Sequence, residues 1–459
     1  MSDSHDYAVV GGGIAGLAAA EMLARNGHDV VLIEKNAKLC QEASASQHGW
    51  FHFGSLYSMF PQPQFLRTLV GGVEDLIDHY ATAPGMNLRI GNGGNLYFED
   101  RPGAWFRDEP IEYLVATRGD PDFDMRRFDG FRGYLKKLFF LGTWEIAIKQ
   151  FISRHKRFHK HDWRGRGEKS ASVLIPGAGW SDYSRDVIEK PDNAACTLDP
   201  DTHFQVKGFD RPMVVVSIIR DLLGSFLSHG GRVLTECEVM TVLPAEGGGK
   251  KLETAQGTIT AKHVVIAAGK WTTTVNPDLK SKVVVSPLLV VYPAVNNRNF
   301  VRMSPFVEKT INHLHHEVDG RRYSLIGGGY SADPQNQAEM ESATAQLKAM
   351  AAKVFPAIAQ AEVTGTYMGF KTEIAAKMGE RNYQYFIRKV DDAMTVIVPG
   401  KFSLSFSLAV NLYRDLTGKA PTGALKSWSD SATLDRYVGL TRHAMIASGQ
   451  QAVEGQASA

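Results

Sequence analysis

The sequence contains little cysteine, no long apolar run and no excess of charge of either sign. Its three cysteines, Cys40, Cys196 and Cys237, form no CxxC pair and no metal-ligand spacing, so we expect neither a disulfide framework nor a metal site. The most apolar stretch, residues 283–295, contains two prolines and is shorter than the roughly 20 residues that a membrane-spanning helix needs. With 51 basic and 49 acidic residues, the chain gives no sign of a nucleic-acid partner.

Several motifs of common enzyme classes are also missing. No GxSxG, HExxH or GxxxxGK[ST] pattern occurs, so nothing supports nucleophilic, zinc-dependent or phosphoryl-transfer chemistry. Residues 1–6 are polar and lead directly into a predicted strand, which is unlike a signal peptide, so a cytoplasmic location is expected. At 459 residues the chain exceeds the about 250–300 residues that one hydrophobic core serves, and two or more domains are expected.

A strand–helix–strand unit is predicted in the first 34 residues. An apolar run at 7–10 leads into GGGIAG at 11–16, a helical stretch of small residues follows, and a β-branched run covers 29–34. The pattern fits GxGxxG, in which the glycines permit a tight turn, close approach of a pyrophosphate and close packing of the helix on the strand. An acidic residue at the end of the second strand can accept hydrogen bonds from ribose hydroxyls. The predicted dinucleotide-contacting residues of this unit are Gly11, Gly13, Ile14, Ala15, Gly16, Glu34 and Lys35.

A second segment favours FAD over NAD. The sequence TAQGTITAKHVVIAAG at 254–269 ends an apolar strand at a glycine, and it resembles the second nucleotide-contacting segment of the D-amino-acid oxidase superfamily. That superfamily includes glycine and sarcosine oxidases, glycerol-3-phosphate dehydrogenase and L-2-hydroxyglutarate oxidase. The resemblance covers residues 5–60, 213–275 and 365–418 and implies a discontinuous FAD-binding domain. It also implies cofactor contacts from Val239, Ala268 and Gly269, and Ser44 and Ser46 are candidates for the phosphates or the flavin edge.

Three further motifs supply candidate catalytic residues. GWFHFG at 49–54 resembles the GxxHxG of the hydroxyglutarate oxidase and glycerol-3-phosphate dehydrogenase branch, which implies His52 at the reactive face, where an imidazole can take a hydroxyl proton. GFK at 369–371 resembles a GxR element and implies that Lys371 holds a substrate anion, although lysine lacks the bidentate fork of arginine. PGKFS at 399–403 resembles a GGKxT element and implies that Lys401 stabilises reduced flavin. The cofactor-binding residues implied by this last element are Gly400, Lys401, Phe402 and Ser403.

Weaker candidates accompany these motifs. Arg67, Arg381 and Tyr383 are second-rank candidates for substrate contact, and each is also compatible with a surface or packing role. His48 has no counterpart in the motif and is interpreted as a structural or surface residue.

The predicted fold is α/β. A doubly wound, Rossmann-like FAD-binding domain is expected from residues 1–90, 213–278 and 361–425. A second, antiparallel-sheet α+β domain that carries the substrate is expected from 91–212 and 279–360. A C-terminal helix and a disordered tail are expected in 426–459.

Basic residues gather in one part of the second domain. Residues 126–169 contain 13 Lys or Arg and four Asp or Glu, a net charge of +9 against −7 for the rest of the chain. Their apolar residues recur at helical spacing, so an inserted, largely helical segment is predicted, consisting of a pair of helices. Such a segment can cap the substrate domain, or it can lie on an anionic membrane surface, and RNA contact is a third reading.

The combined interpretation is an FAD-dependent oxidoreductase. It removes a hydride from a CH–OH carbon of a small anionic substrate, a hydroxy acid or a polyol phosphate, and passes electrons to oxygen, a quinone or a carrier protein. Oxidation of an amine or amino acid is the alternative within the superfamily. A non-catalytic flavin-fold escort protein is a third possibility from another class.

Overall fold

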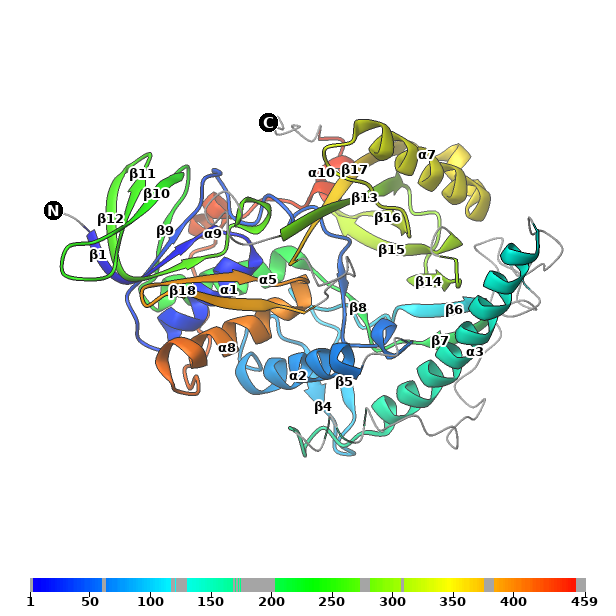
Figure 1. The fold of residues 1–459 in the computed structure, drawn as a ribbon, viewed down its shortest axis with the longest axis horizontal. Coiled ribbons are helices and arrows are strands. Elements are labelled where there is room, and N and C mark those ends of the chain that lie inside the picture. Colours follow the sequence, from blue (N-terminus) through cyan, green and yellow to red (C-terminus); the bar gives the residue numbers. More distant parts are fainter. Residues whose placement is uncertain are drawn as a thin grey trace.

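The computed structural model describes residues 3–59, 63–116, 120, 130–167, 170, 172, 174, 203–272, 281–306, 309–374 and 384–450. Two sheets, each covered by helices, form two lobes that lie side by side (Figure 1). The predicted α/β architecture is confirmed, with a Rossmann-like first lobe and a largely antiparallel second lobe.

The first sheet has a parallel centre. Strands β9 (Arg232–Leu234), β2 (Val30–Ile33), β1 (Asp3–Val10), β12 (Gly257–Ile266) and β19 (Met394–Val398) follow one another in parallel. The first half of β12 also pairs with the antiparallel ribbon β10 (Val239–Pro244) and β11 (Lys250–Thr254). The second half pairs with β19, which continues to β18 (Phe386–Asp391).

Both faces of this sheet are buried at its centre, where β2 and the C-terminal ends of β1 and β12 are apolar. Val9 faces one core cluster, and its neighbours Ala8 and Val10 face the other, as the period of two requires. Helices α1 (Ile14–Arg25), α5 (Val215–Ser228) and α8 (Ser405–Thr417) pack together on the first face, and α2 (Pro63–His79) packs on α8. On the other face, side chains of β10 and β11 complete the core.

The second sheet has seven strands. In spatial order they are β17 (Val363–Ile374), β13 (Ser281–Tyr292), β16 (Arg321–Gly328), β15 (Ile311–Val318), β14 (Phe300–Met303), β6 (Glu112–Ala116) and β7 (His203–Lys207). All neighbours are antiparallel except β14 and β6. Helix α7 (Gln337–Val354) covers one face, on which Ile311 and Ile326 pack against Leu347.

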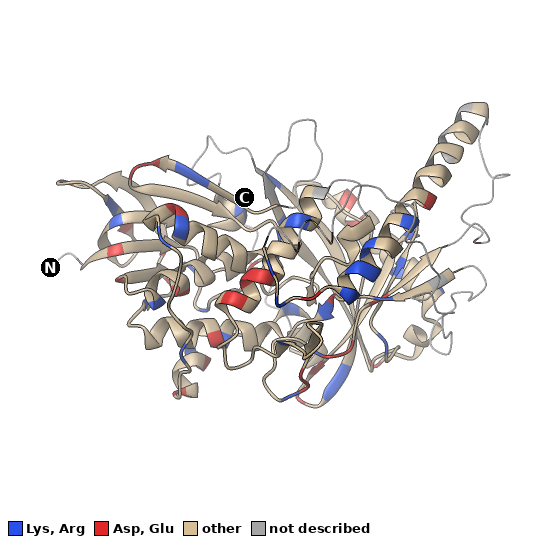
Figure 2. Ribbon diagram, turned by 90° about the horizontal axis from the view of Figure 1, so that it is seen from below, with Lys and Arg blue, Asp and Glu red and all other residues tan. Residues whose placement is uncertain are grey.

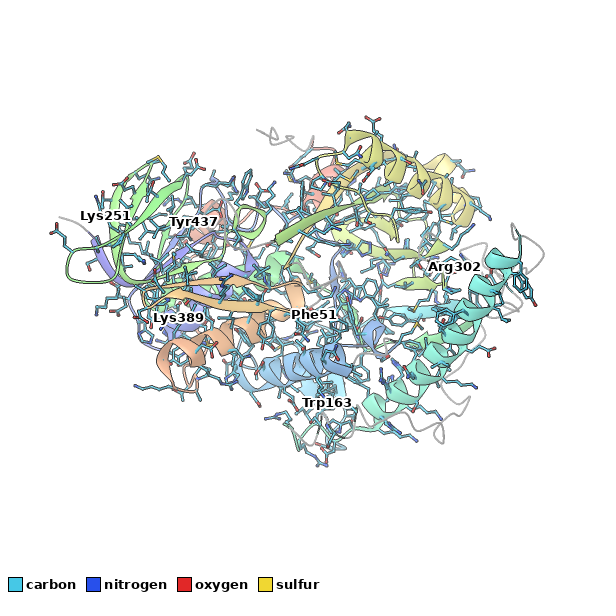
Figure 3. All side chains as sticks on the ribbon, in the orientation of Figure 1. Phe51, Trp163, Lys251, Arg302, Lys389 and Tyr437 are labelled. Carbon is cyan, nitrogen blue, oxygen red and sulfur yellow. The ribbon has the colours of Figure 1, made fainter. Side chains whose placement is uncertain are left out.

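The opposite face of the second sheet is turned towards the first lobe. The strand register places Lys371, Gly369 and Tyr367 of β17 on this face together with Ser286 of β13. On β15 and β16, the residues that alternate with the α7-facing ones also point this way. The short strand β3 (Trp50–Phe51) pairs with β8 (Arg211–Pro212) between the lobes, and Figure 3 shows Phe51 near the middle of the molecule.

The structure differs from the predicted domain boundaries in three places. Residues 363–374 form β17 of the second sheet, so the third FAD segment begins after them and not at 361. The boundary at 90/91 falls inside the hairpin of β4 (Leu88–Ile90) and β5 (Leu96–Phe98), and both of these strands contribute to the first lobe's core. Two short helices, α9 (Ser431–Tyr437) and α10 (Arg442–Ala447), replace one C-terminal helix, and residues 451–459 lie outside the described part.

The basic insert is helical, as predicted, but it forms one helix. Helix α3 spans Gly130–Lys160, and Figure 2 shows it extending away from the rest of the molecule. Its second half packs through Phe151 and Ile152 against the second sheet and against the short helix η1 (Leu56–Met59). The other 3-10 helices within the described residues are η5 (Gly269–Trp271), η7 (Pro356–Gln360) and η8 (Phe402–Leu404).

Candidate active site

The three motif glycines have different surroundings. A Cβ at Gly16 would overlap the carbonyl oxygen of Gly11, and one at Gly11 would lie 2.5 Å from that of Ala267, so both positions exclude side chains through packing. Gly11 also has a φ of +106°, in the region that favours glycine. Gly13 is different, because a Cβ there would meet only Ser44 Oγ, at 3.6 Å. The open space in front of Gly13 is therefore available to a ligand.

The acid at the end of β2 is held next to this loop. Glu34 is buried and accepts hydrogen bonds from the N–H of Gly12 at 2.7 Å and that of Asn36 at 2.8 Å. Burial raises the pKa of this carboxyl, and the two N–H groups act in the opposite direction. Ser44 Oγ accepts a hydrogen bond from Ile14 N–H at 3.0 Å, which places the serine at the N-terminus of α1; its contact with the cofactor stays a prediction.

The second predicted segment comes to the same place. Ala267 N–H donates to Val10 O at 2.8 Å, so Ala268 and Gly269 follow directly beside the glycine loop. Cys237 N–H donates to Glu34 O at 2.9 Å, which puts Cys237 beside the predicted ribose acid. Strand β10 starts two residues after Cys237, at Val239. Lys35 Nζ lies 4.0 Å from the centre of the Trp271 ring.

The PGKFS element forms the entry to α8. Gly400 has a φ of +63°, and the chain then turns through η8 into the helix. Phe402 is half-buried at the start of η8. The hydroxyls of Ser403 and Ser405 are buried there and have no hydrogen-bond partner within the described residues. A helix N-terminus with unpaired hydroxyls suits a polar, electron-rich ligand. These serines, together with the open space at Gly13 and the buried Glu34, fit FAD.

His52 is held by a buried carboxylate that the sequence analysis missed. Its Nδ1 lies 3.3 Å from Asp210 Oδ2, and the same oxygen accepts hydrogen bonds from Trp50 Nε1 at 3.0 Å and Tyr113 Oη at 2.8 Å. The other oxygen of Asp210 accepts the backbone N–H groups of Phe53, Gly54 and Ser55, at 2.9, 3.1 and 3.1 Å. Asp210 therefore fixes both the loop that carries His52 and the orientation of its ring.

Electrostatics keep this pair as a neutral imidazole and a carboxylate. Burial and, after it, the charge of Lys401 lower the pKa of His52 to about 4, while Asp210 acts in the opposite direction. Burial alone would raise the pKa of Asp210, but the hydrogen bonds from His52, Tyr113 and the backbone outweigh it and leave the pKa below its ordinary value. At neutral pH, His52 is unprotonated and Asp210 is ionised.

The predicted catalytic residues come together from three chain segments. The Lys401 Nζ lies 4.9 Å from the Tyr57 ring centre, and the Tyr57 ring stands edge-on to the His52 ring at 5.3 Å. Lys371, on β17, donates to Ser286 Oγ at 3.2 Å, and its charge, like that of Lys401, lowers the pKa of His52. Lys401 and His52 therefore flank the ring of Tyr57, and Lys371 lies close enough for its charge to act on His52; the catalytic roles of these three residues stay predictions.

Other candidates are not part of this cluster. The hydroxyl of Ser46 donates to Glu42 O at 3.1 Å and so stabilises its own loop. Arg67 is exposed on α2. Arg381 and Tyr383 lie outside the described residues. Among the residues that the structure describes, no group of His, Cys, Asp and Glu could hold a metal ion, and no helix is long and apolar enough to cross a membrane.

Comparison with known proteins agrees with this geometry. The family described as FAD dependent oxidoreductase matches residues 6–129 and 216–389, well over half of the chain. The chain therefore belongs to this family of FAD-dependent oxidoreductases, the D-amino-acid oxidase superfamily. It is an FAD-dependent enzyme, and its family implies a small-molecule substrate and an electron acceptor. No curated protein matches the sequence.

Solved structures show the same fold at low identity. L-alpha-glycerophosphate oxidase from Mycoplasma pneumoniae has a TM-score of 0.61 at 14% identity, covering 92% of this chain and 97% of that one. L-proline dehydrogenase from P. horikoshii has 0.58 at 13%, covering 98% and 100%. Glycine oxidase from Geobacillus kaustophilus has 0.56 at 17%, covering 95% and 100%. The names of these enzymes refer to glycerophosphate, proline and glycine, so the shared fold leaves the substrate type open.

Proposed function

We propose that this enzyme oxidises the CH–OH carbon of a small anionic substrate, a hydroxy acid or a polyol phosphate. The observation that carries the proposal is the His52–Asp210 pair, in which a buried carboxylate orients an imidazole that stays neutral at pH 7. An alcohol must lose its hydroxyl proton as its C–H hydride leaves, and a positioned neutral imidazole suits that task.

The geometry defines which nitrogen of His52 acts as the base. A carboxylate can only accept hydrogen bonds, so the Nδ1 that faces Asp210 carries the proton and Nε2 carries the free electron pair. His52 is still 14% exposed in spite of its surroundings, so the ring is not sealed from the space between the lobes. Nε2 accepts the hydroxyl proton, and the adjacent Asp210 charge stabilises the imidazolium that forms.

The two lysines would have different roles, Lys401 at the cofactor and Lys371 at the substrate. FAD, when bound, supplies the hydride acceptor at its N5 atom. Lys401 and the N-terminus of α8 would hold the pyrimidine end of the cofactor and stabilise negative charge there. Lys371, on the face of the second sheet that is turned towards this space, would attract the anionic group of the substrate.

Oxidation of an amine or amino acid is the second candidate. It is supported by the amine-oxidising enzymes among the structures of similar fold. An amine that arrives unprotonated needs no general base, whereas an alcohol always does, so the His52–Asp210 pair favours the alcohol. A non-catalytic escort role receives no support, because the family is one of enzymes.

An anaerobic substrate screen tests the proposal. Holoenzyme is mixed with hydroxy acids, polyol phosphates and amino acids, and loss of the oxidised flavin absorbance is followed. We expect anionic alcohols to bleach the flavin and amino acids to leave it oxidised. Lys371→Met should raise KM strongly for an anionic alcohol and hardly at all for a neutral polyol. Bleaching by amino acids alone would establish the amine reading instead.

A further inference from the structure

A group of buried, unpartnered polar side chains lies beside the proposed active site. His48 lacks a partner at both ring nitrogens, and His316 and His443 each lack one at Nε2, within the residues that the structure describes. Asn312 lacks a partner at Oδ1. His316 and His443 are 6% and 4% exposed. We call these four residues the histidine cluster. The sequence analysis interpreted His48 as structural and did not single out the other three.

The cluster draws its members from three parts of the chain. His48 belongs to the loop before β3, Asn312 and His316 lie on the face of β15 that is turned towards that loop, and His443 lies on α10. The His316 and His443 rings are 4.8 Å apart. Two glycines make this approach possible. A Cβ at Gly49 would overlap the His316 ring, and one at Gly327 would lie 2.8 Å from Asn312 Oδ1 and 3.2 Å from His48 Nε2.

The cluster is continuous with the catalytic residues. The His48 and Trp50 ring centres are 6.4 Å apart, and those of Trp50 and His52 are 4.4 Å apart. The charge of Lys371 lowers the pKa of both His48 and His52, so these side chains share one electrostatic environment. The cluster therefore lies two ring contacts from His52.

The chemistry of the cluster selects the kind of group that it would bind. Burial lowers the pKa of His48 and of His443 to about 3, and it lowers the pKa of His316 well below its ordinary value, so all three are neutral near pH 7. A neutral imidazole offers one donor and one acceptor, and Asn312 Oδ1 is an acceptor. The Tyr323 hydroxyl lies 2.6 Å from His443 Nδ1 and that of Thr441 3.3 Å from it, so Nδ1 of His443 is partnered and Nε2 is the nitrogen left for a ligand.

A hydroxyl group matches this mixture of donors and acceptors. It both donates and accepts, whereas a carboxylate or phosphate only accepts and would meet the unpaired oxygen of Asn312 without a proton between them. An apolar group of a ligand would leave the hydrogen-bonding atoms of all four residues without partners, which is unfavourable. The positive charge needed for an anion is present nearby in Lys371 and not in the cluster itself.

We propose that His48, Asn312, His316 and His443 bind hydroxyl groups along the chain of the substrate, so that the preferred substrate is a polyhydroxylated anion. This inference rests on the proposed oxidation of an anionic alcohol and narrows its substrate class. Anions with an apolar chain become poor substrates even where they carry the reacting hydroxyl. When such an anion binds, the buried polar groups of the cluster are left without hydrogen-bond partners.

Matched pairs of substrates test the proposal. Anaerobic flavin reduction is measured with 2,3,4-trihydroxybutanoate and 2-hydroxybutanoate, and with glycerate and lactate. Each pair shares the charge and the reacting carbon and differs in the further hydroxyls. We expect at least a tenfold preference for the polyhydroxylated member in one or both pairs. The preference should fall towards one in Asn312→Ala and in His316→Phe.

A matched variant and a second readout keep the test decisive. Glu317→Gln changes an exposed residue on the same strand and should leave the preference intact. The anaerobic melting temperature of the holoenzyme reports binding without turnover. Trihydroxybutanoate should raise it more than 2-hydroxybutanoate does in the unaltered enzyme, and equally little in Asn312→Ala, a variant that removes no hydrogen bond made by Oδ1.

The outcomes separate this proposal from the one it rests on. If 2-hydroxybutanoate reduces the flavin as well as trihydroxybutanoate and stabilises the protein equally, the histidine cluster does not bind hydroxyls, although the alcohol oxidation stands. If no anionic alcohol reduces the flavin and trihydroxybutanoate still stabilises the protein through Asn312, the oxidation is wrong and the binding site is retained. If neither effect occurs, both are overturned.

Discussion

At the scale of single residues, the site depends on Asp210 as much as on His52. The motifs could predict His52, Lys371 and Lys401, because each lies in a short local pattern. Asp210 is 158 positions from His52, and only the fold brings them together. The sequence offers a single acidic residue between Phe209 and a basic residue, which is too common a pattern to single out. Burial and six donors, which make Asp210 important, are properties of tertiary structure.

Replacing Asp210 should impair both the base and the fold. Asp210 raises the pKa of His52, so Asp210→Asn should lower that pKa below about 4, weaken the base and slow flavin reduction at least tenfold at pH 7. The folded-state pKa of Asp210 is lowered, so its ionisation stabilises the protein above the unfolded value of about 3.9, and the variant should melt earlier at pH 7.

A matched carboxylate serves as the control for Asp210. Asp221 accepts hydrogen bonds from Trp105 Nε1 at 2.7 Å and Gly85 N–H at 2.6 Å and has no contact with His52. Asp221→Asn should change stability without changing the rate of flavin reduction at saturating FAD. If Asp210→Asn reduces flavin as fast as Asp221→Asn does, Asp210 has only a structural role.

At the scale of elements, the glycines of the loop at 11–16 differ in role. Gly11 and Gly16 allow close packing of the backbone, whereas Gly13 leaves space for a ligand. The βαβ unit could be predicted in detail, because the strand periodicity, the glycines and the acid lie within 34 residues. The sheet to which β17 belongs could not be predicted, because its partner β13 precedes it by about 80 residues. The sequence of a single strand does not specify which sheet the strand joins. Long-range pairing therefore accounts for the error at residues 363–374.

Two substitutions in the loop should behave oppositely. Gly13→Val meets no protein atom closer than Ser44 Oγ and has an ordinary φ of −68°, so the protein should fold but fail to take up FAD. Gly16→Val overlaps the carbonyl of Gly11, so it should destabilise the fold itself. Circular dichroism and FAD titration distinguish the two. Uptake of FAD by folded Gly13→Val at the unaltered affinity would show that the pyrophosphate lies elsewhere.

Helix α3 presents an apolar and basic surface over its first half. Phe131 is 74% and Phe139 is 69% exposed, and Tyr134, Leu135 and Leu138 are also exposed. The sequence around them has a net charge of +9. Its second half is covered by the protein, in agreement with the cap reading. The predicted peripheral membrane contact stays a prediction for the first half.

Vesicle sedimentation tests that prediction. Holoenzyme should sediment with anionic vesicles at low salt and be released as salt is raised, because the Debye length falls from about 30 Å at 0.01 M to about 8 Å at 0.15 M. Leu138→Ser with Phe139→Ser should abolish binding, whereas Met240→Ser, at an exposed apolar position on β10, should not. Equal recovery with neutral and anionic vesicles would leave only the cap.

At the scale of the whole molecule, buried neutral histidines couple folding to pH. Burial lowers the pKa of five histidines to about 3 or 4 and that of His316 well below its ordinary value, and these six residues lie in both lobes and on α3. They are His48, His52, His155, His313, His316 and His443. The unfolded chain binds protons at these residues below about pH 6.5, whereas the folded chain does not until about pH 4 or lower.

Stability should therefore fall steeply on mild acidification. Each such histidine lowers the free energy of unfolding by up to about 1.4 kcal/mol per pH unit below its unfolded pKa of about 6.5. Urea unfolding of the holoenzyme at pH 7.5, 6.0 and 5.0 should show midpoints that decrease sharply below pH 6.5. A free energy of unfolding that is constant between pH 7.5 and 5.0 would show that these histidines are not held neutral by the fold.

The proposed chemistry is tested most directly by the rate of anaerobic flavin reduction in His52→Ala. The best anionic alcohol found in the screen is mixed with unaltered and variant holoenzyme, and FAD content is measured in both. We predict that FAD content is unchanged and that the reduction rate falls by about 10²–10⁴, the range for loss of a general base. An unchanged rate in FAD-loaded His52→Ala would contradict the assignment of His52 as the base.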